Sequence, residues 1–136
     1  MGSVSKARIT NWYIRSVLIT SGLIIAAPGI IGAVSPEGLA GLYGLDAVMT
    51  HTESVLLRHR GVLLAIVGSL LLAAVMLRSL RIPAIIFGII SNISFILLTV
   101  GYPASHADLA RIAWVDVLLT VLLVSALIIH TRHQRS

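Results

Sequence analysis

The chain has 136 residues, of which 57% are hydrophobic and only 11% are charged, and its formal net charge is +5. A water-soluble domain of this size carries more polar surface, so the composition excludes an ordinary soluble enzyme. The absence of cysteine excludes disulfides, thiol nucleophiles and thiolate metal sites. Because the basic residues border hydrophobic stretches, we interpret the positive charge as contact with membrane lipids and expect no nucleic-acid partner.

Four long apolar stretches dominate the chain, at about residues 16–34, 55–77, 83–100 and 112–129. Each has about 18 to 23 residues, the length that an α-helix needs to cross a hydrocarbon layer about 30 Å thick. Their unbroken apolar character argues against the alternating strands of a membrane β-barrel. The sequence therefore predicts one all-α domain over residues 1–136, a four-helix transmembrane bundle.

The first stretch follows a basic head and could be a signal sequence, but its length and the three later stretches favour a retained span. It contains Pro28, which permits a kink. The segment Ser35-Pro36-Glu37 combines a capping serine, a proline and an acid, the pattern that begins a helix. We predict a short helix on the outer face over about residues 36–45, ended by Gly44 and carrying Tyr43.

Basic residues concentrate on one side of the predicted bundle. Seven of the ten fall there, namely Lys6, Arg8, Arg15, Arg78, Arg81, Arg132 and Arg135. The positive-inside rule makes this side cytoplasmic, so we predict that both termini are cytoplasmic. The acids fall in the outer half: Glu37, Asp46, Glu53 and Asp108 in loops, and Asp116 inside the fourth stretch. The tight connection at 78–81 predicts that the second and third stretches form an antiparallel hairpin.

Arg58, His59 and Arg60 stand in a row inside the second stretch. If that helix begins near Ser54, they lie one to two turns below the outer face, where charged side chains are costly. Each arginine could reach up to the headgroups. Asp116 lies at a similar depth in the fourth stretch, so we predict an ion pair between it and an arginine of the second. Such a pair could be catalytic or could only lock two helices together.

Polar side chains in the third and fourth stretches complete a candidate site. Ser91, Asn92 and Ser94 lie near the middle of the third stretch, and Thr120 lies one helical turn from Asp116. With Tyr43 they could bind a substrate in a narrow polar cavity open to the outer side. The alternative is that they only join helices by hydrogen bonds.

The histidine pattern gives no support for a metal site. The chain has five histidines, and His59 alone lies inside a span. Helical His-x-x-x-His and Glu-x-x-His pairs are missing from the sequence. His130 and His133 fall beside arginines in what we interpret as a solvated tail. We predict neither a metal nor a cofactor.

Four segments resemble a group of small four-helix bacterial membrane proteins. They are Leu39–Asp46 (LAGLYGLD), Leu56–Gly68 (LLRHRGVLLAIVG), Ser91–Leu98 (SNISFILL) and Leu109–Val117 (LARIAWVDV). Many members are labelled phosphopantetheine adenylyltransferase, but this sequence lacks the histidine-glycine-histidine phosphate motif of that soluble enzyme. The resemblance implies a four-helix fold in a bacterial inner (plasma) membrane and marks Arg58, His59, Arg60, Asn92 and Asp116 as residues to test.

The sequence is compatible with three functions. The first is a protein that binds a lipid-soluble small molecule, and can transform it by cofactor-independent acid–base chemistry such as isomerisation, cyclisation or epoxide opening. Asp116, Arg58, His59 and Arg60 would be the catalytic candidates, and we expect a homo-oligomer. The second is a structural or accessory subunit of a larger membrane complex. The third is a small transporter, which we rank last because Asp116 is the one acid inside a span.

Overall fold

The computed structural model describes residues 2–45, 49–101 and 107–135, with side chains for residues 7–45, 49–101 and 110–132. Its helices are α1 (Gly2–Val34), α2 (Pro36–Leu42), α3 (His51–Met76), the 3₁₀ turn η1 (Arg78–Leu80), α4 (Arg81–Gly101) and α5 (Ala107–Arg135). Four of them are long and apolar enough to cross a membrane, over Ala7–Val34, His51–Met76, Arg78–Gly101 and Ala110–Arg132. The prediction of an all-α four-helix membrane bundle is confirmed. Asp46 and the side chain of Asp108 lie outside the described residues.

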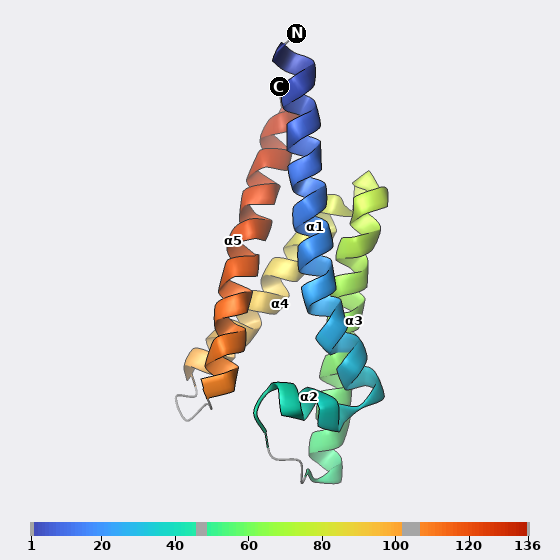
Figure 1. Cartoon of the computed structure of the whole chain (residues 1–136), viewed down its shortest axis with the longest axis vertical. Helices are drawn as coiled ribbons and strands as arrows, with labels where there is room; N and C mark the ends of the chain where they lie inside the picture. Colours follow the sequence, from blue (N-terminus) through green and yellow to red (C-terminus); the bar gives the residue numbers. More distant parts are fainter. Residues whose placement is uncertain (1, 46–48, 102–106, 136) are drawn as a thin grey trace.

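The two ends of the bundle differ in what they hold (Figure 1). The start of α1 and the end of α5 lie together at one end, which we call the terminal end. The short helix α2 and the start of α3 lie at the opposite end, which we call the α2 end. The turn between α3 and α4 faces toward the terminal end, so these helices form the predicted hairpin.

The boundaries of α2 and α3 are set by capping residues. Ser35 accepts a hydrogen bond from the Gly38 nitrogen at 3.1 Å and begins α2 as predicted. Gly44, with a positive φ of 65°, follows its end. α3 begins at His51 and not near Ser54, because Thr50 and Glu53 form a capping box in which each side chain bonds the other residue's backbone nitrogen.

Small residues line the contact between α1 and α3. A Cβ placed on Gly68 would lie 2.5 Å from the backbone nitrogen of Ala26, and a Cβ on Gly61 would lie 2.5 Å from that of Ala33. Real Cβ atoms do not come this close to a backbone atom, so the two helices touch through their main chains. Close approach at small residues gives membrane helices extensive van der Waals contact. α1 and α3 therefore form a firmly packed pair along most of the length of α3.

Replacing Gly68 with alanine should force α1 and α3 apart. We expect the Gly68→Ala variant to lose about 1–3 kcal/mol of unfolding free energy, the usual cost of overpacking. The measurement is equilibrium unfolding in mixed detergent micelles followed by circular dichroism. Gly41→Ala is the matched control, since a Cβ there would meet no atom within 4 Å, and its stability should be unchanged or slightly higher. Equal stability of the two variants would contradict the described contact.

The packed core occupies the half of the bundle toward the terminal end. All four long helices contribute buried side chains to it, namely Ile14, Val17, Leu18, Ile25, Leu71, Ala74, Ala84, Ile85, Leu119, Leu123 and Ala126. The Tyr13 hydroxyl lies 2.7 Å from that of Ser125, joining α1 to α5. Because Ser125 donates its own hydrogen to the Leu122 carbonyl, Tyr13 is the donor in this pair.

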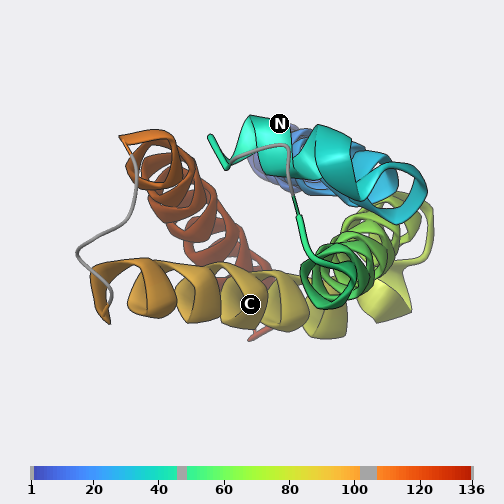
Figure 2. The ribbon, with the colours of Figure 1, turned by 90° about the horizontal axis from the view of Figure 1, so that it is seen from below.

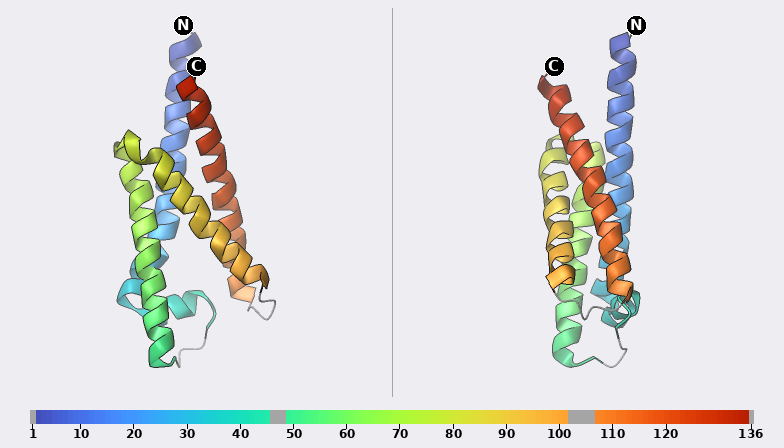
Figure 3. Two further views of the ribbon diagram at one scale, coloured as in Figure 1. Left: turned by 180° about the vertical axis from the view of Figure 1, so that it is seen from behind. Right: turned by 90° about the vertical axis from the view of Figure 1, so that its left-hand side faces the viewer.

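The helices separate toward the α2 end. Figure 3 shows α4 leaning away from α3 along its course, with α5 beside its far end. Seen along the bundle from the α2 end, α1 and α3 lie on one side and α5 on the other, and α4 runs along one edge of the bundle from beside α3 toward the side where α5 begins (Figure 2). This divergence creates room for a cavity in the half of the bundle that the packed core does not fill.

Candidate functional site

A cavity of about 520 Å³ lies between the four long helices near the α2 end. Most of its wall is apolar, and polar groups reach it from Tyr43, which follows α2, and from α3, α4 and α5. Its lining residues are Ile24, Ile25, Ala27, Pro28, Ile31, Leu42, Tyr43, Arg60, Leu63, Leu64, Ser91, Asn92, Ser94, Phe95, Leu98, Ile112, Val115 and Asp116. A concave, largely apolar site with a few converging polar groups is typical of small-molecule binding.

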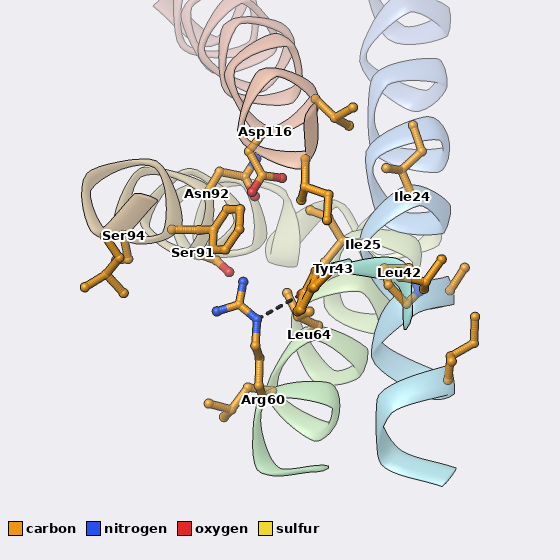
Figure 4. A pocket seen from close by; sticks show the side chains of 18 residues that line it. Ile24, Ile25, Leu42, Tyr43, Arg60, Leu64, Ser91, Asn92, Ser94 and Asp116 are labelled. Atoms are coloured by element: carbon orange, nitrogen blue, oxygen red, sulfur yellow. Dashed lines mark hydrogen bonds between the residues drawn. The ribbon is translucent and has the colours of Figure 1, made fainter. Parts of the chain in front are cut away.

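Arg60 points into the cavity and is held by two aromatic rings (Figure 4). Its Nε donates a hydrogen bond of 2.9 Å to the Tyr43 hydroxyl, which follows α2. Its guanidinium carbon lies 4.4 Å from the centre of the Phe95 ring and 5.3 Å from that of Tyr43. The two rings stack with centres 6.1 Å apart and planes inclined by 23°. Cation–π contact and this hydrogen bond together allow a cation to lie in an apolar wall.

Asn92 presents a buried donor without a partner. Its side chain is only 2% exposed, and its Nδ2 has no hydrogen bond to any residue that the structure describes. Asn92 lies on α4, eleven residues after Arg81, at about 16 Å of helical rise and thus near the middle of the span. Leaving such a group unpaired costs about 1–3 kcal/mol. An unsatisfied amide beside a cavity is therefore suited to donate a hydrogen bond to a bound molecule.

Asp116 faces the same cavity from α5, near Asn92 (Figure 4). It is half-buried, and within the described part of the chain its carboxylate makes neither a hydrogen bond nor an ion pair with an arginine of α3. The predicted ion pair is therefore wrong as a contact, because Arg60 bonds Tyr43 instead. Arg60 and Asp116 still line the same cavity, from α3 and α5. The two groups thus oppose each other with space between them.

The remaining predicted residues divide into those at the cavity and those away from it. Ser91 and Ser94 line it, but the Ser94 hydroxyl already donates to the Ile90 carbonyl at 2.7 Å. Arg58 and His59 are exposed and do not line it. Thr120 also does not line it: its hydroxyl donates to the Asp116 carbonyl at 2.7 Å.

His130 also differs from its prediction. It is 9% exposed and therefore buried, contrary to the prediction of a solvated tail. The side chain of His133 lies outside the described residues.

Phe95 is the main site residue that the sequence interpretation missed. It lies three residues after Asn92 and four after Ser91, so helical spacing places all three on one side of α4. An aromatic residue within an apolar run carries no chemical signature of its own. Its role becomes visible only when Arg60 of α3 and Tyr43 are seen against its ring.

Polar groups of the cavity do not form a metal site. Within the side chains that the structure describes, no three histidine, aspartate or glutamate residues come together in a group that could hold a metal ion. The cavity instead contains the Asp116 carboxylate, the Asn92 amide donor and the Arg60 guanidinium, which is hydrogen-bonded to Tyr43. Comparisons of the chain with protein-family models, with curated proteins and with solved structures give no match.

Proposed function

We propose that this protein binds a lipid-soluble small molecule in the cavity and transforms it by proton transfer. The observation that carries the proposal is the buried Asn92 side chain, whose amide nitrogen has no partner among the described residues, beside the Asp116 carboxylate in a largely apolar cavity. An amide used only to join helices would have a partner on another helix. A bound molecule with a carbonyl, hydroxyl or epoxide oxygen would supply the missing acceptor.

The size and lining of the cavity support a small amphipathic ligand. Sites for such molecules usually enclose about 300–1,000 Å³, and this cavity of about 520 Å³ lies within that range. Its walls would contact the apolar body of the ligand, and the polar groups would orient its head. A scaffold subunit would have no need of such a space, so the cavity favours this proposal over the accessory-subunit alternative.

The groups present are sufficient for a proton-transfer reaction without a cofactor. Asp116 is the proton acceptor and donor: it removes a proton from the carbon between the carbonyl and a carbon–carbon double bond of the ligand and returns it to the far carbon of that double bond, which shifts into conjugation with the carbonyl. Asn92 donates to the carbonyl oxygen, on which negative charge develops, and Arg60 supports that charge from the opposite wall. The net change is an isomerisation, which needs no further reactant.

Access from the lipid phase is consistent with the exposure of the lining residues. On the α3–α4 side, Leu63 and Leu98 are 49% and 57% exposed. On the α1–α2 side, Ile31 and Leu42 are 41% and 49% exposed. The cavity wall is therefore continuous with the apolar outer surface, so a molecule dissolved in the bilayer can enter without crossing water.

The charge distribution supports an orientation for this site. The terminal end carries most of the lysine and arginine residues, so we place it on the cytoplasmic side of a bacterial inner membrane. The α2 end then faces outward, and the cavity lies in the outer half of the bilayer.

Filling the cavity tests the proposal. The protein is purified in mild detergent and extracted with organic solvent, and the extract is analysed by mass spectrometry for a small molecule that copurifies. Ser91→Phe places a ring in the cavity and should abolish copurification. Ser69→Phe, the same change at an exposed position of α3 away from the cavity, should leave it intact. Equal retention by both variants would contradict binding in the cavity, and extracts without any small molecule would contradict the proposed function.

A further inference from the structure

Arg81 lies almost fully buried at the terminal end, where α4 begins. Only 4% of its surface is exposed. Its Nε donates to the Ala74 carbonyl in the last turn of α3 at 3.3 Å, and one terminal nitrogen donates to the Asn11 amide oxygen on α1 at 3.0 Å. A guanidinium has five N–H groups, so these two bonds fix its plane and leave three N–H groups without a hydrogen bond to any residue that the structure describes.

Positive charges converge on this guanidinium. Arg78 lies three residues before Arg81, and Arg15 lies about one helical turn after Asn11, the α1 residue that Arg81 contacts; both are exposed. Within the described residues, no carboxylate forms an ion pair with any of the three. In the sequence, none of the five acids falls near this end, since all belong to segments at the opposite side of the predicted bundle. A buried cation without a counter-charge is costly, so a bound anion would stabilise this cluster.

The depth of the cluster matches the headgroup layer. Arg78 and Arg81 occupy the turn between two spans, where a helix leaves the hydrocarbon. Trp12 precedes the Tyr13 hydroxyl contact on α1 and is 70% exposed, as expected of an aromatic side chain at the membrane interface. The free N–H groups of Arg81 therefore lie at the level where lipid phosphates are found.

We propose that Arg81, Arg78 and Arg15 form a binding site for a phosphate group, supplied by the headgroup of an anionic lipid in the leaflet at the terminal end. Arg81 provides fixed donors whose planar arrangement matches two phosphate oxygens. The exposed Arg15 and Arg78 place positive charge beside the remaining phosphate oxygens. The site lies at the opposite end of the bundle from the cavity and does not depend on the function proposed for it.

Native mass spectrometry of the detergent-purified protein tests this site. Phosphatidylglycerol, phosphatidylcholine and inorganic phosphate are the probes. We expect tighter binding of phosphatidylglycerol than of phosphatidylcholine, with phosphatidylglycerol binding weakened about fivefold for each exposed arginine removed in an Arg15→Gln/Arg78→Gln variant. The control variant Arg58→Gln/Arg132→Gln has the same net charge but alters two exposed arginines outside the cluster. It should bind phosphatidylglycerol like the unchanged protein.

Each outcome decides the proposal. Phosphatidylglycerol retained against millimolar inorganic phosphate supports a lipid headgroup, whereas its displacement by phosphate supports the same site with free phosphate as its ligand. Arg81→Lys keeps the charge but loses the planar donors, so it should also weaken phosphatidylglycerol binding while circular dichroism shows an intact fold. Equal binding by the cluster variant and its charge-matched control would overturn the proposal, as would equal binding of the two lipids with no effect of phosphate.

Discussion

Asp116→Asn should remove proton transfer while leaving ligand binding in place. Asparagine keeps the shape of the side chain in the cavity but cannot accept or donate the transferred proton. The rate should fall about 100-fold to 10,000-fold, the usual contribution of a positioned acid–base group. The measurement is hydrogen–deuterium exchange at the carbon beside the carbonyl in a panel of lipid-soluble ketones, incubated with the protein in D₂O and followed by mass spectrometry.

Glu37→Gln is the control for this experiment. Glu37 is an exposed acid in the first turn of α2 and does not line the cavity. Its loss should leave the exchange rate unchanged. If Asp116→Asn exchanged the ketones as fast as the unchanged protein, Asp116 would not carry the proton. If the ligand still copurified with that variant, binding would stand without the chemistry.

Asn92→Leu should make the protein more stable and less able to hold its ligand. Leucine is similar in size to asparagine and has no donor to leave unpaired, so the unfolding free energy should rise by about 1–3 kcal/mol. Ligand retention should fall in the same variant, because the oxygen of the ligand loses its hydrogen-bond donor. Opposite changes in stability and binding are typical of a side chain kept for function at the expense of packing.

Asn11→Leu is the matched control and should have the opposite effect on stability. The Asn11 amide oxygen accepts a hydrogen bond from the buried Arg81, so its removal should lower the unfolding free energy by about 1.5–3 kcal/mol. Both variants can be compared by equilibrium unfolding in mixed micelles. A loss of stability in Asn92→Leu would mean that its amide already has a favourable partner, and the main support for the proposed site would disappear.

Most of the fold could be predicted from the sequence because membrane spans and helix caps are local features. The lengths of the apolar stretches gave the four spans, and Ser35 with Pro36 gave the start of α2. Six predicted site residues line one cavity, namely Tyr43, Arg60, Ser91, Asn92, Ser94 and Asp116. Those inside spans could be identified because polar side chains within a span are rare enough to be informative.

The partners of these residues could not be predicted, because they depend on how helices rotate and diverge. Arg60 faces inward while its neighbour Arg58 faces outward, and the sequence spacing alone does not show which of them faces the bundle. Thr120 lies on the same face of α5 as Asp116, but one turn nearer the packed core, beside the buried Leu119. There its hydroxyl finds an acceptor in its own helix, as short hydroxyl side chains often do.

The contact between Arg60 and Tyr43 limits the net charge that a ligand of the cavity can carry. An anionic guest would meet the Asp116 carboxylate, and the one nearby cation already donates to Tyr43 and lies against the Phe95 ring. A cationic guest would meet the Arg60 guanidinium in a wall that offers few polar groups to solvate it. Uncharged molecules avoid both repulsions and leave the contacts of Arg60 with Tyr43 and Phe95 intact. We therefore expect the natural ligand to be electrically neutral.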